Sequence, residues 1–138
     1  MGVKFRYEKE KSTLVDIIYR PKAEITLKTV AGETKVDMYI DSGADITLIP
    51  RSFGEALGFE LKKSDIKELR GVGEGSVPVI VENVRMKISN HEFPARIGWA
   101  LIEEVPPLLG RMDVFDKFRI IFDCMESTTF HQLENFSL

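Results

Sequence analysis

Two aspartates stand four residues apart in one short segment, Asp41-Ser42-Gly43-Ala44-Asp45. An alternation of apolar and polar residues over 36–40 leads directly into this segment, which is therefore expected to begin where a strand ends. Carboxylates in such a loop can act as general acid and general base, or as ligands of a metal ion. An aspartate at a strand end is also common as a turn or capping residue, so this segment alone does not choose between chemistry and structure.

A second segment, Gly71-Val72-Gly73-Glu74-Gly75, contains three glycines within five residues. Glycine rotates freely about both backbone bonds, so this is the most flexible stretch of the sequence. The segment lacks the G-x-G-x-x-G spacing, and no helical pattern follows it to hold a phosphate group. A mobile hairpin tip is the expected structure.

The length and composition of the chain limit the classes of protein that can contain these two segments. The chain has 138 residues, of which 43% are hydrophobic and 30% charged, with a formal net charge of −3. This length supports one core and excludes a large bilobal enzyme. The charge balance does not favour binding to nucleic acid or to an anionic membrane. Cys124 is the single cysteine, so no internal disulfide can form, and with no apolar run of membrane-spanning length we expect a cytoplasmic protein.

Period-two alternation dominates the rest of the sequence and predicts a mainly β fold. Residues 24–28 and 35–40 form the clearest expected hairpin. Strands are also expected at 3–7, 15–19, 77–81, 84–88, 93–101, 119–123 and 128–133. The polar run 8–12 is expected to be a turn. Two short helices are predicted, at 51–57 after Pro50 and at 111–118, where apolar residues recur every three positions.

The sequence resembles the retropepsin-like aspartic peptidases over about residues 23–123. The residues that carry the resemblance are an apolar strand running into Asp41-Ser42-Gly43-Ala44, the glycines of 71–75, and Leu108-Leu109-Gly110-Arg111. The resemblance implies a closed β-barrel with a flap hairpin and one or two short helices. The domain is expected to span residues 1–138, with 1–22 as an extension whose role is open.

The resemblance also implies roles for individual residues. Asp41 would be the catalytic carboxylate, and Ser42 would hydrogen-bond across a dimer axis. Gly43 would let the backbone approach a peptide, and Ala44 would keep the loop small. Asp45 would form a buried ion pair with Arg111. Finally, Gly71, Val72, Gly73, Glu74 and Gly75 would form a flap that folds over the substrate.

The Asp-Ser-Gly motif occurs once in the chain. Aspartic peptidases need two carboxylates close enough to share one proton, because like charges at that distance cannot both ionise. The second carboxylate would come from a second subunit, which predicts a homodimeric aspartic endopeptidase acting on peptides or unfolded proteins. No metal, cofactor, nucleic acid or membrane is expected to take part. Two alternatives remain: a non-catalytic dimerisation or peptide-binding module with the same fold, and a weaker one, a metal-dependent hydrolase using Asp41 and Asp45.

Overall fold

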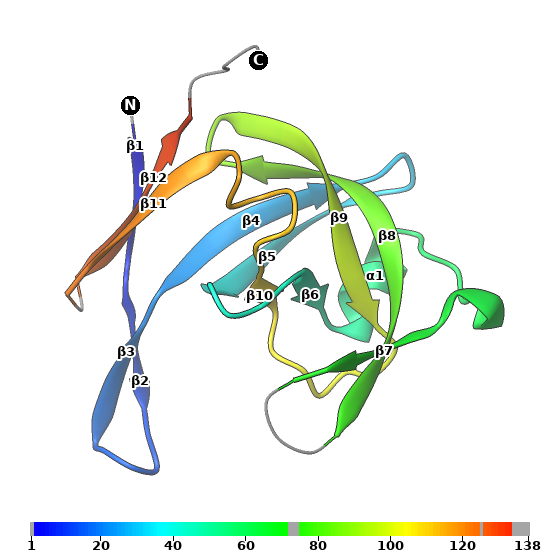
Figure 1. Ribbon diagram of the computed structural model, residues 1–138, viewed down its shortest axis with the longest axis horizontal. Coiled ribbons are helices and arrows are strands. Elements are labelled where there is room, and N and C mark those ends of the chain that lie inside the picture. The colour runs from blue at the N-terminus through cyan, green and yellow to red at the C-terminus, as the bar shows by residue number, and fades with distance from the viewer. Residues whose placement is uncertain (1, 72–74, 125, 134–138) are drawn as a thin grey trace.

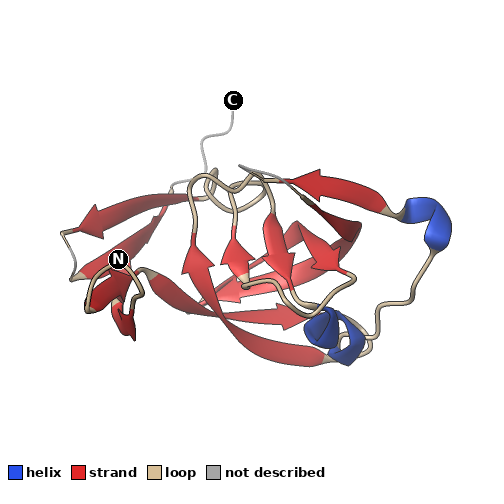
Figure 2. Ribbon diagram, turned by 90° about the horizontal axis from the view of Figure 1, so that it is seen from below, coloured by secondary structure: helices blue, strands red, loops and turns tan. Residues whose placement is uncertain are grey.

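The structure, a computed structural model, describes residues 2–71, 75–124 and 126–133. Strands predominate (Figures 1 and 2). In chain order the elements are β1 (Gly2–Arg6), β2 (Glu8–Lys11), β3 (Ile17–Arg20), β4 (Lys22–Lys28), β5 (Glu33–Ile40), β6 (Thr47–Ile49), α1 (Arg51–Ala56), the 3-10 turn η1 (Lys63–Asp65), β7 (Lys67–Arg70), β8 (Ser76–Ile88), β9 (His91–Ala100), β10 (Leu108–Leu109), β11 (Phe118–Asp123) and β12 (Ser127–Gln132).

Six strands close into a barrel, in the order β4-β5-β10-β6-β9-β8. The barrel closes where β4 pairs with β8, with Leu27 opposite Met86. Strand β7 pairs with the first part of β8 and extends the sheet beyond the closed ring. The expected β-barrel is therefore present, and the expected hairpin of β4 and β5 is confirmed.

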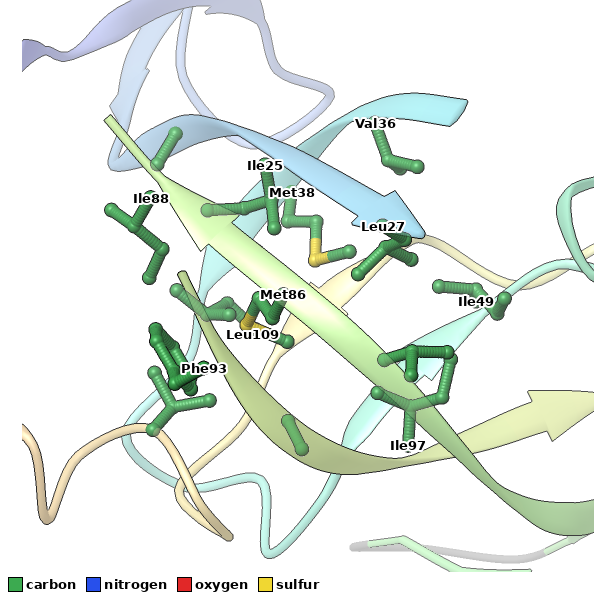
Figure 3. Packing of buried hydrophobic residues seen from close by; sticks show 14 of the residues in the cluster. Ile25, Leu27, Val36, Met38, Ile49, Met86, Ile88, Phe93, Ile97 and Leu109 are labelled. Carbon is green, nitrogen blue, oxygen red and sulfur yellow. The ribbon is translucent and has the colours of Figure 1, made fainter. Parts of the chain in front are cut away.

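The barrel interior is filled by the apolar members of the alternating strands (Figure 3). Ile25 and Leu27 on β4, Met38 on β5 and Met86 on β8 are all fully buried. Polar neighbours on the same strands face outward, because successive side chains of a strand point to opposite faces. Burial of the apolar side chains supplies the hydrophobic stabilisation that holds the barrel closed.

Residues 77–81 and 84–88, expected as two strands, form the single strand β8. Glu82 pairs with Ile97 and Asn83 with Arg96 on the neighbouring β9. The polar residues between the two apolar runs thus continue the ladder. A long partner strand keeps the pairing in register where the sequence pattern alone indicates a break.

The amino-terminal strands expected at 3–7 and 15–19 are present as β1 and β3, but the segment between them differs from expectation. Strand β1 pairs with β12, which also pairs with β11, so that a three-stranded sheet stands beside the barrel. The polar run expected to be a turn instead forms β2, and it pairs with β3 as a separate two-stranded ribbon (Figure 1). The prediction failed here because charged residues alternate on β2 and give no apolar signal.

One of the two predicted helices is confirmed. Helix α1 begins after Pro50, and the chain leaves it through Gly58, whose φ is +80°. The second prediction, a helix over 111–118, is wrong, because residues 111–117 form a bend and consecutive turns and Phe118 begins β11. Asp113 has a φ of +64°, a left-handed conformation that stops a right-handed helix from continuing. Among the described residues, no helix is long and apolar enough to cross a membrane.

Candidate active site

Asp41 is the first residue after β5, and backbone hydrogen bonds fix its position. Its N–H donates to the carbonyl oxygen of Leu109 over 3.0 Å, and its own carbonyl accepts from the N–H of Ala44 over 3.2 Å. The carboxylate oxygen Oδ1 accepts from the N–H of Gly43 over 2.9 Å. The side chain is half-buried and held in one orientation by its own loop.

The two sequence motifs lie side by side because β10 runs between β5 and β6. Leu109 pairs with Ile40, the residue before Asp41. Beyond β10, the N–H of Arg111 donates to the carbonyl of Ala44 over 2.9 Å, and that of Met112 to the carbonyl of Asp45 over 2.8 Å. The 110–113 turn therefore supports the second half of the Asp41 loop, at Ala44 and Asp45.

Thr47 and Gly110 form a buried contact beneath the loop. The side chain of Thr47 is fully buried, and its hydroxyl accepts a hydrogen bond of 3.1 Å from the N–H of Gly110. A Cβ atom at Gly110 would overlap the carbonyl group of Ile46 and lie 2.7 Å from the nitrogen of Thr47. Glycine is therefore required sterically at position 110. The sequence analysis missed Thr47, whose only signal is a threonine within an otherwise apolar strand.

Asp45 and Arg111 form the expected ion pair, between a carboxylate oxygen and a terminal guanidinium nitrogen. The expectation that this pair is buried is wrong, since the side chains are 78% and 55% exposed. Exposed ion pairs contribute little to stability because water screens them and ordering two side chains costs entropy. The backbone bonds of the 110–113 turn hold the loop more firmly than this pair does.

A second ion pair, missed by the sequence analysis, anchors that turn to the barrel. Arg96 on β9 donates from Nε to Oδ2 of Asp113 over 2.8 Å and from Nη2 to Oδ1 over 3.0 Å, and its backbone N–H also donates to Oδ2 over 2.9 Å. The Arg96 side chain holds the pKa of the Asp113 carboxyl down at about 2. Asp113 thereby ties the turn that carries Arg111 to β9.

Two cavities meet at Asp41. One, of about 490 Å³, is lined by Arg20, Pro21, Tyr39, Pro106 and Leu108. The second, of about 440 Å³, is lined by the Asp41 loop and by residues 69–71 and 77 of the β7–β8 hairpin. Asp41 and Leu108 belong to both cavities. A carboxylate at the junction of two hollows is well placed to act on a chain that lies across both.

The β7–β8 hairpin brackets the glycine-rich segment. Gly71 follows β7 and lines the second cavity, while Gly75 is exposed and has a φ of +103°, which favours glycine. Val72, Gly73 and Glu74 lie outside the described residues. Ser42 and Gly43 are exposed at the surface of the Asp41 loop, and Ala44 is half-buried.

Within the described part of the chain, no three His, Cys, Asp or Glu side chains lie together in a way that could hold a metal ion. The metal-dependent alternative therefore depends on Asp41 and Asp45 alone. Both come from one loop, and Asp45 is already paired with Arg111.

Comparison with known proteins identifies the family and the fold. A family model described as aspartyl protease matches residues 27–112. In structure the chain is similar to a retropepsin-like aspartic protease from Rickettsia conorii, with a TM-score of 0.59 and 17% identity over 94% of this chain and 91% of that one. It is also similar to EIAV protease complexed with the inhibitor HBY-793, with a TM-score of 0.49 and 21% identity over 67% of this chain and 82% of that one. No curated protein matches the sequence.

Proposed function

The chain belongs to the aspartyl protease family and has the retropepsin-like fold, and from this premise we propose that it is an endopeptidase that works as a homodimer. Each subunit contributes one catalytic carboxylate, Asp41. The substrate is a peptide or an unfolded stretch of protein.

The observation that carries the proposal is the position of Asp41 at the meeting point of two cavities. Its Oδ1 is oriented by the N–H of Gly43, and its backbone by Leu109. A group held this way does not have to be reoriented when substrate arrives, and such preorganisation lowers the barrier to reaction. A purely structural turn aspartate would not need to face two hollows.

Catalysis would use the two Asp41 carboxylates as one unit that shares a proton. The ionised carboxylate takes a proton from a water molecule, whose oxygen attacks the peptide carbonyl carbon. The protonated carboxyl group donates a hydrogen bond to the carbonyl oxygen as negative charge develops there. When the carbon–nitrogen bond breaks, the leaving amine takes up a proton from the pair.

The surrounding loop would hold the two carboxylates together and present the substrate. We assign the contact across the two-fold axis to Ser42 and the close approach to the peptide backbone to Gly43. Ala44 keeps the loop small. Asp45, paired with Arg111, would face the backbone of a bound peptide.

The β7–β8 hairpin would act as the flap. Its described residues Leu69, Arg70, Gly71 and Val77 already line the second cavity. Closure over a bound peptide would exclude water from the carboxylates and strengthen the electrostatic interactions there. We assign this role to residues 71–75 as a group.

A non-catalytic peptide-binding dimer is the alternative, and subunit mixing separates it from the peptidase. The test compares cleavage of an unfolded protein pool by the wild-type chain, by Asp41→Asn and by Asp37→Asn. Asp37 is an exposed aspartate on β5, so its variant is a matched control. We expect Asp41→Asn to lose at least about a thousandfold in rate and Asp37→Asn to keep full activity.

Mixing equal amounts of wild-type and Asp41→Asn chains then tests the shared pair. If both carboxylates are required, random exchange of subunits leaves about a quarter of the wild-type activity, because only dimers with two intact copies work. A monomeric enzyme would keep about half. Cleavage that survives Asp41→Asn refutes the assignment of Asp41 as the catalytic residue. Inhibition of cleavage by a chelator supports the metal-dependent alternative. A chain that forms dimers but never cleaves supports the non-catalytic binding module.

A further inference from the structure

Residues 8–20, which we call the arm, form a two-stranded ribbon of β2 and β3 beside the barrel (Figure 1). In the described structure these strands pair only with each other and form a sheet of their own. An isolated two-stranded ribbon is at best marginally stable in water. The arm therefore needs support from other parts of the molecule or from a partner.

One face of the arm is tied to its own barrel by charged groups. Lys22 Nζ lies 3.3 Å from Oε1 of Glu8 and 3.5 Å from Oε2 of Glu10. The hydroxyl of Tyr39 donates to Glu10 over 3.0 Å, and Lys22 Nζ also lies 4.5 Å from the centre of the Tyr39 ring. These contacts occupy both acidic side chains of β2.

The opposite face of the arm, free of contacts with the other described residues, combines positive charge with apolar surface. By the alternation of strands, Lys9 and Lys11 on β2 share this face with Tyr19 and Ile17, their pairing partners on β3. Ile17 and Tyr19 are both 43% exposed. At the tip, Leu14 is 93% exposed. Apolar side chains gathered on a projecting ribbon indicate a docking surface.

The charge of the chain identifies a suitable partner. The arm itself is neutral, with three Lys or Arg and three Asp or Glu, but its acidic side chains on β2 contact Lys22 and Tyr39, so the free face carries the two lysines. Since the whole chain has a net charge of −3, the rest of the chain outside the arm also carries −3. The free face of the arm, with its two lysines, thus complements the negative net charge of another copy of the same chain. Such complementarity favours encounter in the correct orientation.

The base of the arm lies where a partner subunit would be. Arg20 and Pro21 line the same cavity as Asp41. If two copies of Asp41 meet on a two-fold axis, as the proposed function requires, this cavity and the base of the arm lie close to the second subunit. We propose that the free face of the arm, carrying Lys9, Lys11, Ile17 and Tyr19, docks on the barrel of the second subunit.

Photocross-linking of the full-length chain tests the contact directly. Tyr19→benzoylphenylalanine places a photoreactive group on the free face, and Val30→benzoylphenylalanine places the same group on the exposed β4–β5 turn. We expect illumination to yield a covalent species of twice 15.7 kDa from the position 19 variant and at least about ten times less of it from the position 30 variant. Equal yields, or links only within one chain, would overturn the proposal.

Charge reversal tests the electrostatic part. Lys9→Glu combined with Lys11→Glu should raise the dimer dissociation constant about tenfold at low salt, and the difference should shrink as salt is added. Lys62→Glu combined with Lys63→Glu is the control, because these exposed lysines precede and begin η1. Thermal unfolding confirms that each variant folds. An equal loss of dimer in both variants would contradict the proposal.

The two proposals fail in different ways. If the chain cleaves nothing but the position 19 variant still cross-links, the arm contact stands and the peptidase does not. If cleavage and subunit mixing behave as expected while the position 19 variant gives no intermolecular product, the peptidase stands and the arm contact is refuted. Cross-linking in an Asp41→Asn background gives the same product if docking is independent of catalysis.

Discussion

The Asp41 loop and the end of the arm line one cavity, but the loop and the arm are held by different forces. The loop rests on backbone hydrogen bonds from the 110–113 turn and on the buried contact between Thr47 and Gly110. The arm rests on charged side chains, with Lys22 at the centre of its contacts. The loop therefore depends on steric fit, and the arm depends on charge and on salt.

The difference suits the two proposed tasks. A carboxylate that must meet its copy across an axis has little tolerance for displacement, and backbone contacts in a packed interior supply that precision. A docking arm must form and release contacts as subunits associate, and exposed charge pairs are weak enough to allow this. Substitutions in the loop support should therefore affect folding and activity together, whereas substitutions in the arm should mainly affect dimer formation.

Gly110→Ala should have the largest effect. The new methyl group would overlap the carbonyl of Ile46, and its neighbours are all backbone atoms that cannot move aside cheaply. We expect a loss of about 3 kcal/mol in the free energy of unfolding and loss of cleavage. Urea denaturation followed by tryptophan fluorescence measures the first, since Trp99 is buried in the core.

Gly98→Ala is the matched control for that substitution. A Cβ atom at Gly98 would lie 3.4 Å from the carbonyl oxygen of Thr47 and 3.5 Å from the side chain of Leu48. These are ordinary contacts, so the variant should lose much less stability. Equal losses at positions 98 and 110 would contradict the view that the loop depends on steric fit beneath it.

The contrast between backbone support and side-chain support also explains which parts of the structure could be predicted from the sequence. Alternating apolar residues predicted β4, β5, β9 and the terminal pair, because the core selects one face of each strand. The Asp41 loop and the 108–111 segment were predicted by their motifs, and the structure brings them together. The predicted helix over 111–118 failed because the conformation there depends on a side-chain partner far along the chain. Asp113 leaves the helical conformation while Arg96, 17 residues earlier, binds its carboxylate, and no local pattern shows this.

Asp113→Asn should have an intermediate and pH-dependent effect. Asparagine tolerates the φ of +64° at this position but loses the charge that Arg96 binds. The folded-state pKa of about 2 lies below the ordinary aspartate value, so the stabilising contribution is present above about pH 4 and is lost as the pH falls toward 2. Because Arg96 is half exposed, we discount this contribution to about 1 kcal/mol.

Denaturation from pH 6 down to pH 2 measures that contribution. The wild-type chain should be more stable than Asp113→Asn at pH 6, and the two should converge near pH 2. Asp37→Asn serves as the control, since Asp37 is exposed on β5 and outside the ion pairs of the described residues. A constant difference between wild type and Asp113→Asn across this range would mean that the Arg96 pair does not hold the turn.

Tyr39→Phe should have the smallest effect, confined to the arm. The substitution removes the hydroxyl that donates to Glu10 but keeps the ring against which Lys22 lies. Loss of this half-buried hydrogen bond should raise the opening constant of the arm about fivefold, or about 1 kcal/mol, while the barrel keeps its stability. Amide hydrogen exchange should therefore quicken in β2 and β3 and stay unchanged in β5 and β9. Tyr7→Phe is the control, because it makes the same chemical change outside the Lys22 cluster. Two outcomes would show that the arm is not held separately from the barrel: faster amide exchange in the arm of both variants, or faster amide exchange in all strands of the Tyr39→Phe variant.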